Sequence, residues 1–202
     1  MKIRIKFSKH GNTKYVGHLD IMRYFQKAMR RADIPIRYSE GFSPHQVMSF
    51  AAPLGIGIES DSEYLDIEVT DSIDSSEAIK RLNSVMCEGI KIIEWKQLPD
   101  NSKTAMSQVA SADYFVLCEC NDISPLDKAE ILVEKETKSG ELKQVDIKPM
   151  LYSVKKTEGG LLMHVAQGSS GNLKPETVMK ALRIDEYHII RKAIYDISGL
   201  TL

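Results

Sequence analysis

Cysteine is scarce in this sequence, and long apolar runs are absent. The 202 residues contain three cysteines, Cys87, Cys118 and Cys120, and an odd number of this kind does not build a disulfide framework. No apolar run approaches the roughly 18 residues of a membrane-spanning helix, and the alternating, charged start of the chain is unlike a signal peptide. We therefore expect a protein of the reducing cytoplasm that makes no contact with membranes.

Motifs for nucleotides and metals are also missing. The GxxxxGK[ST] pattern of a nucleotide-binding P-loop does not occur, and three cysteines fall short of the four that usually hold an iron–sulfur cluster. His10, His18 and His45 lie in one region of the chain, but their spacing matches no compact metal-ligand motif. We expect neither a bound metal nor a cofactor.

Positive charge is concentrated near the start of the chain. The formal net charge is −1, and the hydrophobic share of 43% and charged share of 27% are ordinary for a globular protein. Residues 1–50 nevertheless contain ten Lys and Arg residues and three acidic residues, a net charge of +7, so the remaining residues carry −8. Such asymmetry favours a surface that faces a polyanion, although charge in a short window also varies by chance.

The first 98 residues show the pattern of a small α+β domain. Lys2–Phe7 alternates charged and apolar residues, as a half-buried strand does, and the apolar residues of His18–Ala32 recur with helical spacing. The further predictions are strands at Ile34–Tyr38, Gln46–Ala52, Glu63–Val69 and Ile90–Leu98, and a helix from Ser75 or Ser76 to about Cys87. The order β-α-β-β-α-β is that of a ferredoxin-like domain.

The second half repeats this order after a polar connector at residues 99–112. Its predicted elements are a strand at Tyr114–Cys120, a helix from Ser124 to about Lys135, a loop at Thr137–Leu142, strands at Gln144–Lys155 and Leu161–Ala166, a helix from Pro175 to about Leu182, and a strand at Ile189–Ile197. The sequence therefore predicts the α+β class, with two tandem ferredoxin-like (βαββαβ) domains at residues 1–98 and 113–202.

The helix predicted at His18–Ala32 has two distinct faces. Its apolar residues fall on one arc and its basic residues on the opposite arc. We call the basic set the basic ridge: Arg23, Lys27, Arg30 and Arg31. Such rows bind phosphate backbones because each contact releases condensed counterions; an ordinary solvated face is the alternative. The first helix predicted in the second half mixes acidic and basic residues, so the fold by itself does not require a basic ridge.

The loop Ser39–His45 (SEGFSPH) is the second candidate element. Gly41 permits a positive φ and Pro44 restricts the chain. Phe42 either offers an exposed ring for base stacking or packs inward. The predicted nucleic-acid-binding residues are Lys14, Arg23, Lys27, Arg30, Arg31, Arg37, Phe42, Ser43 and His45.

Two histidines are candidates for catalysis. His18 or His45 could act as a general base in RNA cleavage, but the sequence shows no acid or lysine to partner either residue. A protein without catalytic activity is therefore the favoured interpretation.

The stretch from Tyr15 to Ser60 resembles the bacterial radical-SAM-linked family, a domain of unknown function. The matching residues are Gly17, His18, Leu19, Asp20, Arg30, Arg31, Ser39, Gly41, Phe42, Pro44, His45, Pro53, Leu54 and Gly55, with Asp146, Pro149 and Pro175 further on. In that family the domain is a separate chain or follows a radical SAM protein. The chain lacks the CxxxCxxC motif of the radical SAM cluster, so the resemblance implies a partner of such an enzyme rather than the enzyme.

The resemblance and the basic region together predict an accessory RNA-binding module that presents tRNA or rRNA to a radical SAM protein. The tandem plan is also similar to that of the RNA-binding RAMP proteins of CRISPR systems, at the level of the fold alone. Two alternatives stay open. One is a metal-independent endoribonuclease of RAMP type, and the other is a protein-docking subunit whose basic ridge meets an acidic face of the radical SAM partner without contacting RNA.

Overall fold

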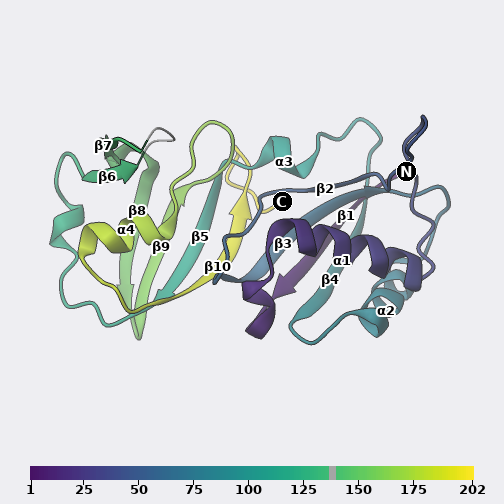
Figure 1. Cartoon of the computed structure of the whole chain (residues 1–202), viewed down its shortest axis with the longest axis horizontal. Coiled ribbons are helices and arrows are strands. Elements are labelled where there is room, and N and C mark those ends of the chain that lie inside the picture. Colours follow the sequence, from purple (N-terminus) through teal and green to yellow (C-terminus); the bar gives the residue numbers. More distant parts are fainter. Residues whose placement is uncertain (137–139) are drawn as a thin grey trace.

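A large mixed sheet with few helices forms the molecule (Figure 1). The computed structural model describes residues 1–136 and 140–202. Within these residues, eight strands share one sheet in the order β4-β1-β3-β10-β5-β9-β8, with β2 paired to β3 beside this path, and β6 and β7 form a separate sheet. The bounds are β1 Lys2–Lys9, η1 Gly11–Tyr15, α1 His18–Arg31, β2 Met48–Phe50, β3 Glu59–Glu68, α2 Ser75–Val85, β4 Ile90–Leu98, α3 Ala105–Gln108, β5 Ser111–Leu117, η2 Ser124–Leu126, β6 Leu132–Glu136, β7 Leu142–Asp146, η3 Lys148–Met150, β8 Leu151–Thr157, β9 Gly160–Ala166, α4 Pro175–Leu182 and β10 His188–Tyr195, where η marks a 3-10 helix.

β1 lies inside the first half of the sheet because it pairs with a strand on each side. Ile5 lies opposite Leu65 of β3 and opposite Trp95 of β4, both in antiparallel register. The alternation predicted for this strand is confirmed, since Ile3, Ile5 and Phe7 are all buried. β2 pairs antiparallel with β3, so the strand order in this half is β4-β1-β3-β2.

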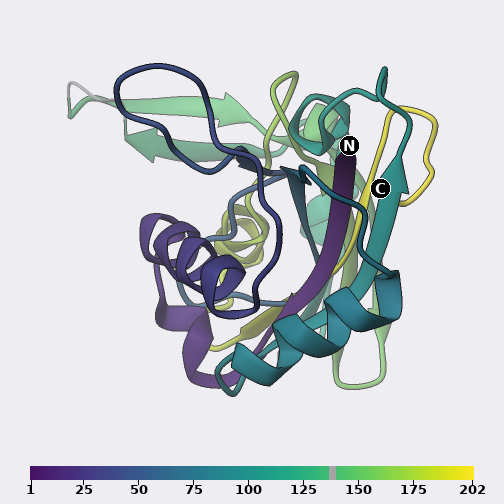
Figure 2. The same cartoon turned by 90° about the vertical axis from the view of Figure 1, so that its right-hand side faces the viewer.

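α1 and α2 pack against the same hydrophobic core in this half (Figure 2). The helix predicted at His18–Ala32 is confirmed: α1 buries Phe25 and Met29 completely, and the Phe25 ring centroid lies 4.8 Å from that of Phe7. α2 adds Leu82 to the core. Each fully buried apolar side chain of this size stabilises the fold by about 1.5–3 kcal/mol. Among the described residues, no helix is long and apolar enough to cross a membrane.

The second half of the sheet consists of β5, β8, β9 and β10. β9 lies between β5 and β8, where Met163 is opposite both Tyr114 and Val154. β10 pairs antiparallel with β5, so the strand order is β10-β5-β9-β8. α4 packs on this half through Val178 and Met179, and Figure 1 shows α4 and α1 in front of the same sheet.

β3 and β10 join the two halves through a short parallel pairing, with Ser60 opposite Arg191. Arg191 is 1% exposed. Its guanidinium donates to both oxygens of the Glu63 carboxylate, at 2.6 and 2.5 Å, and to the carbonyl of Ala52 at 2.7 Å. Burial alone lowers the pKa of Arg191, but the adjacent Glu63 charge raises it by more, so the net shift in the pKa of Arg191 is upward. Removing one partner of such a pair costs about 3–5 kcal/mol.

The strand predicted at Ile34–Tyr38 does not form, and this prediction is wrong. The segment contacts other strands through isolated bridges, Ile36 to Val69 and Tyr38 to Gln46. After α1 the chain turns sharply at Asp33, whose φ is 48°. Pro35 follows and has no N–H to donate to a strand partner, so continuous pairing cannot begin here.

The helix predicted from Ser124 to about Lys135 is also wrong. It stops after the single 3-10 turn of η2, and β6 begins at Leu132. Ile131 and Val133 are buried whereas Leu132 is 54% exposed. This period of two belongs to a strand, and it outweighs the helix-start signal of Ser124 and its following proline.

The strand predicted at Gln144–Lys155 is divided between two strands. β7 pairs with β6 in the small sheet, whereas β8 pairs with β9 in the large one. Pro149 lies in η3 between them, where its missing N–H and fixed φ interrupt strand pairing. Of the loop predicted at Thr137–Leu142, residues 137–139 lie outside the described residues.

Candidate nucleic-acid interface

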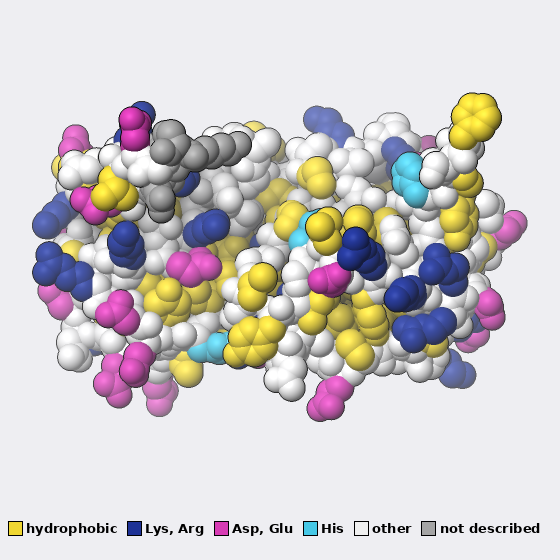
Figure 3. Space-filling view, in the orientation of Figure 1, with side chains coloured by type: hydrophobic (Ala, Val, Ile, Leu, Met, Phe, Trp, Pro, Cys, Tyr) yellow, Lys and Arg dark blue, Asp and Glu magenta, His cyan; other side chains and the backbone are white. Residues whose placement is uncertain are grey.

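The basic ridge lies on the solvent side of α1. Asp20 in the first turn and basic residues in the last turn suit the helix dipole. Because Phe25 and Met29 are fully buried beneath the helix, its opposite face is exposed to solvent, and that face carries Arg23 and Lys27. Figure 3 shows Lys and Arg side chains gathered over α1.

Arg23, Lys27 and Arg30 differ in their pairing. Arg23 lies 3.3 Å from the carboxylate of Asp20, but both side chains are about two-thirds exposed, and such a surface pair contributes about 0–1 kcal/mol. Lys27 and Arg30 have no acidic group within 4.0 Å among the residues that the structure describes. These two side chains are therefore the unpaired cations of the ridge.

Arg31 is exposed but is held by neighbouring groups. Its guanidinium donates to the carbonyl of Val85, the last residue of α2, at 3.1 Å. It also lies 5.9 Å from the centroid of the Tyr24 ring, within the range of a cation–π contact. Arg31 thus helps to hold α1 against α2, a contact that its place in the sequence did not indicate.

The loop Ser39–His45 is closed at its base and presents its tip to solvent. The Ser39 N–H donates to the His45 carbonyl at 2.8 Å, and the His45 N–H donates to Oγ of Ser39 at 3.1 Å. Gly41 has a φ of 104°, which favours glycine. Phe42 is fully exposed and Ser43 is exposed. Of the two arrangements considered for Phe42, the structure shows the outward one.

Lys14 and Arg37 are each paired with an acid of the chain itself. The Lys14 ammonium lies 3.8 Å from the carboxylate of Glu59. The Arg37 guanidinium lies 2.9 Å from Glu68 and 4.0 Å from Glu40. These two predicted binding residues therefore carry less free positive charge than Lys27 and Arg30.

The histidines predicted to lie in one region have separate surroundings. His18 begins α1, and its ring stands edge-on to Phe50 at 5.3 Å. The Nδ1 atom of His45 lies 2.9 Å from the Ser39 hydroxyl. Neither ring has a carboxylate within 4.0 Å among the described residues, whereas His10 contacts two acids. The general-base role considered for His18 and His45 therefore gains no orienting carboxylate from the fold.

Gln46 is a buried residue of this region that sequence reasoning missed. It is 3% exposed and lies at the foot of the loop, where its amide nitrogen donates to the carbonyl of Gln26 at 3.2 Å and contacts the Tyr38 hydroxyl at 3.3 Å. Its Oε1 atom is buried and has no hydrogen-bond partner within residues 1–136 and 140–202. An acceptor of this kind can receive a donor from a ligand, but no pattern in the sequence marks it.

Glu59 brings together two histidines that are distant in the sequence. Its carboxylate lies 3.2 Å from Nδ1 of His10, 3.3 Å from Nε2 of His188 and 3.0 Å from the N–H of Gly11. Burial alone raises the pKa of Glu59, but these hydrogen bonds lower it more, so the pKa lies below its ordinary value. Within the described residues, no group of three or more His, Cys, Asp or Glu side chains is arranged to hold a metal ion.

A hydrogen-bonded group of three side chains on β5, β9 and β10 contains one histidine, His164. Nδ1 of His164 is 2.6 Å from one carboxylate oxygen of Asp113, and the Tyr195 hydroxyl donates to the other oxygen at 2.7 Å. This hydrogen bond, with burial, raises the pKa of Tyr195 to about 12. Asp113 therefore orients both rings, an arrangement that the sequence could not show because the three residues are far apart in the chain.

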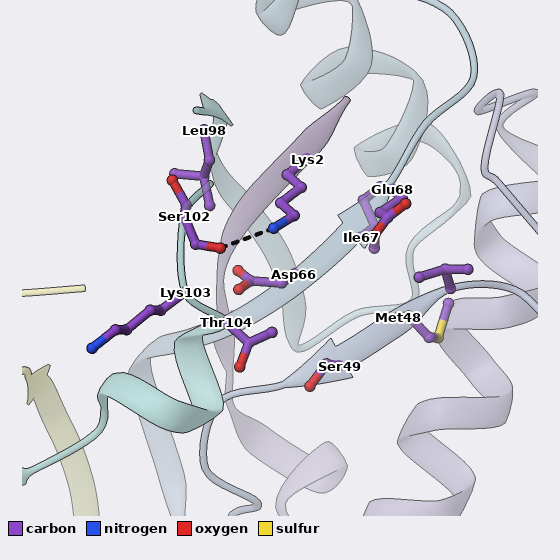
Figure 4. Close-up of a pocket in the computed structure, with 11 residues that line it drawn as sticks. Lys2, Met48, Ser49, Asp66, Ile67, Glu68, Leu98, Ser102, Lys103 and Thr104 are labelled. Atoms are coloured by element: carbon purple, nitrogen blue, oxygen red, sulfur yellow. Dashed lines mark hydrogen bonds between the residues drawn. The ribbon is translucent and has the colours of Figure 1, made fainter. Parts of the chain in front are cut away.

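A cavity of about 100 Å³ lies between β2, β3 and the connector. Figure 4 shows the residues that line it. Two of its charged residues are already engaged. The Lys2 ammonium donates to the carbonyl of Ser102 at 2.9 Å, and Asp66 accepts from Arg4 at 2.8 Å and from the N–H of Ala105 at 2.6 Å. These contacts hold the connector against the sheet, so they account for Lys2 and Asp66 without a ligand.

The fold and the exposed surfaces together define a mixed α/β protein with an exposed basic helix face and a projecting loop. The chain belongs to a family described as "Uncharacterized protein conserved in bacteria (DUF2344)", whose model matches residues 2–175. No curated protein matches the chain.

Proposed function

We propose that this protein is an accessory RNA-binding module that presents tRNA or rRNA to a radical SAM enzyme. The observation that carries the proposal is the exposed basic face of α1, where Lys27 and Arg30 have no acidic partner among the described residues. Unpaired cations of this kind bind phosphates because they release counterions. The exposed ring of Phe42 supports the same function, since an unpaired base can stack on it.

We infer in addition that the two halves are tandem ferredoxin-like units, within residues 1–98 and 113–202. The strand orders β4-β1-β3-β2 and β10-β5-β9-β8 support this, because in each half the first strand lies between the last and the third. In the second half, η2 and the hairpin of β6 and β7 stand where the first helix of such a unit belongs. RAMP proteins bind RNA with this plan, which is an analogy of fold.

The link to a radical SAM enzyme rests on the resemblance of residues 15–60 to the radical-SAM-linked family. The sequence lacks the CxxxCxxC motif of that enzyme's cluster, so a partner chain would supply the chemistry. Isolation of the tagged protein from its bacterial host, followed by mass spectrometry, tests this link. Recovery of no radical SAM protein would contradict it and would leave the RNA-binding proposal standing.

Fluorescence anisotropy with labelled tRNA and rRNA fragments over a salt series tests RNA binding. We expect binding that weakens as salt rises. The charge-reversal variant Lys27→Glu/Arg30→Glu should weaken binding at every salt concentration and reduce the salt slope by about 1 for each lost phosphate contact. The matched control, Lys155→Glu/Lys156→Glu, makes the same change at exposed residues of β8 and should bind more nearly as the parent does.

Two outcomes would overturn the RNA-binding proposal. One is no binding at low salt, and the other is equal binding by the parent and the ridge variant. An acidic protein surface is the other partner that the same cations could meet. In that case the ridge variant would lose a protein partner that survives nuclease treatment of the extract, while RNA binding would stay undetectable.

A further inference from the structure

A cavity lies between the two halves of the chain, apart from the basic ridge. Its volume is about 70 Å³. Pro53 and Gly55, from the segment between β2 and β3, form one wall, and Tyr114, Gln167 and Glu176 of the second half form another. One ordered water molecule needs a cavity volume of roughly 10–15 Å³, so this cavity has room for a ligand group larger than one water molecule.

Glu176 is an acceptor without a partner in this cavity. It belongs to the first turn of α4, and its Oε2 atom is buried and has no hydrogen-bond partner in the part of the chain that the structure describes. Lys174 lines the same cavity but forms no ion pair with Glu176 within 4.0 Å among the described residues. A buried carboxylate oxygen without a donor is costly and needs an explanation.

Several side chains of the cavity wall are hydrogen-bonded to one another. Arg191 contacts the Tyr114 hydroxyl at 3.4 Å, Tyr114 donates to Oε1 of Gln167 at 2.8 Å, and the Gln167 amide donates to Oδ1 of Asn172 at 2.8 Å. None of these groups donates to Glu176. The chain of hydrogen bonds thus holds the wall in place, but it supplies no donor to the Glu176 carboxylate.

We propose that this cavity binds the donor edge of a guanine base of RNA, with Glu176 as its acceptor; the proposal rests on RNA being the ligand of the protein. An ionised carboxylate only accepts hydrogen bonds, and guanine presents N1–H and N2–H side by side on its Watson–Crick edge. Lys174, which only donates, complements the O6 and N7 acceptors of guanine. Reading an unpaired base by its edge is the usual mode of sequence-specific RNA recognition.

Gly55 offers a second way to test the cavity. A Cβ atom at this position would lie 3.2 Å from Cδ1 of Ile58 and 3.7 Å from Oε1 of Glu176. The substitution Gly55→Ala therefore narrows the cavity beside the carboxylate, and the flexible end of Ile58 can adjust. Glu176→Gln keeps the size of the side chain but replaces one acceptor oxygen with a donor nitrogen.

Isothermal titration of the full chain with guanosine, inosine and adenosine 5′-monophosphates tests the proposal. We expect saturable binding of the guanine nucleotide and about tenfold or weaker binding of the other two, because inosine lacks the 2-amino donor and adenine has an acceptor at N1. Glu176→Gln and Gly55→Ala should each weaken guanine binding about tenfold or more. Glu119→Gln, the same change at an exposed site, should leave it unchanged.

Thermal unfolding without nucleotide separates a binding role from a structural one. If Glu176 serves a ligand, Glu176→Gln should unfold at the same or a higher temperature, because it alters a carboxylate whose buried Oε2 atom has no donor among the described residues. A lower unfolding temperature with unchanged guanine binding would assign Glu176 to the fold and overturn the proposal. Absence of any preference for guanine over inosine would overturn it as well.

The RNA experiment distinguishes this failure from failure of the proposed function. RNA that binds through the basic ridge but is indifferent to replacement of its guanosines by inosine would leave the proposed function intact and reject the guanine site. Binding of the guanine nucleotide without any binding of RNA would reject the proposed function and keep the site as one for a free nucleotide.

Discussion

In the projecting loop Ser39–His45, the side chain of Phe42 does not pack against the fold. The Phe42 side chain is fully exposed, and the backbone and Ser39 hydroxyl close the loop without it. Because the ring is as exposed to water as in the unfolded chain, it adds no hydrophobic stabilisation to the fold and is available for contact with a ligand. By contrast, Arg37 beside it is neutralised by Glu68 at 2.9 Å. Of these two predicted binding residues, Phe42 therefore has its whole ring available for contact with a ligand, whereas the charge of Arg37 is already paired.

Phe42→Ala should separate binding from stability. We expect the free energy of unfolding to change by no more than about 0.5 kcal/mol, as for other exposed sites. RNA binding should weaken by about 1–3 kcal/mol if a base stacks on the ring. Urea unfolding and anisotropy with labelled RNA measure the two effects. Ile197→Ala, which removes another exposed apolar side chain, should change neither, and equal RNA binding by parent and Phe42→Ala would remove the ring from the interface.

At the scale of elements, the hairpin of β6 and β7 replaces a helix that the sequence predicted. Its inner side chains join the core of the second half: Val133 and Ile147 are buried with Leu173, next to α4. Leu132, on the outer side of the same hairpin, is 54% exposed. The hairpin is thus held by one apolar face, which a mixed-charge helix at the same residues would not have presented.

Ile147→Ala should destabilise the protein by about 2–5 kcal/mol, because it leaves a cavity in this core. Leu132→Ala, one strand away on the exposed side, should change the free energy of unfolding by about 0.5 kcal/mol or less. Urea unfolding of both variants gives the comparison. Similar losses from the two substitutions would mean that the hairpin does not pack as described.

For the whole molecule, contacts between β1, β3 and β10 hold the two halves together. Arg191 and Glu63 form the buried pair at this junction. Glu59 contributes at the edge, since it contacts His10 from the segment after β1 and His188 of β10. Asp61 contacts His10 as well and pairs with Lys192. Basic side chains from both halves therefore have their acidic partners among a few carboxylates of β3.

Stability should fall at acidic pH in a way that depends on Glu59. Its pKa in the folded state lies below the ordinary value of 4.5, so the unfolded chain binds this proton more readily. The carboxylate therefore adds stability above about pH 4.5, and this contribution disappears as the pH falls through the lower folded value. Urea unfolding across this range should show a shallower decline for Glu59→Gln than for the parent.

Glu88→Gln is the control for this measurement, since Glu88 is exposed. It should retain the full acidic decline of the parent. A parent-like decline in the Glu59→Gln variant would contradict the role given to Glu59, because the lost stability would then come from other carboxylates.

Much of the local structure could be read from the sequence. The helix at His18–Ala32 formed as predicted because its apolar spacing is a property of neighbouring residues. The same spacing placed the basic residues on the exposed side. Ile34–Tyr38 does not form a strand, because strand formation depends on a partner and this segment makes only isolated bridges. At residues 131–133 the alternation of buried and exposed residues outweighs the helix-start signal at Ser124. Local patterns thus predict helices more reliably than strand pairing.

By itself, then, the sequence determined α1, its basic ridge and the turn residues of the loop, since each depends on residues a few positions apart. Only the tertiary structure decided which cations are free: Lys14 meets Glu59 and Arg37 meets Glu68 across the fold, whereas Lys27 and Arg30 meet no acid in the described part of the chain. It also placed Glu176 and Gly55, which are far apart in the sequence, in the lining of one cavity. Such pairings join distant residues, and only chain packing brings those together.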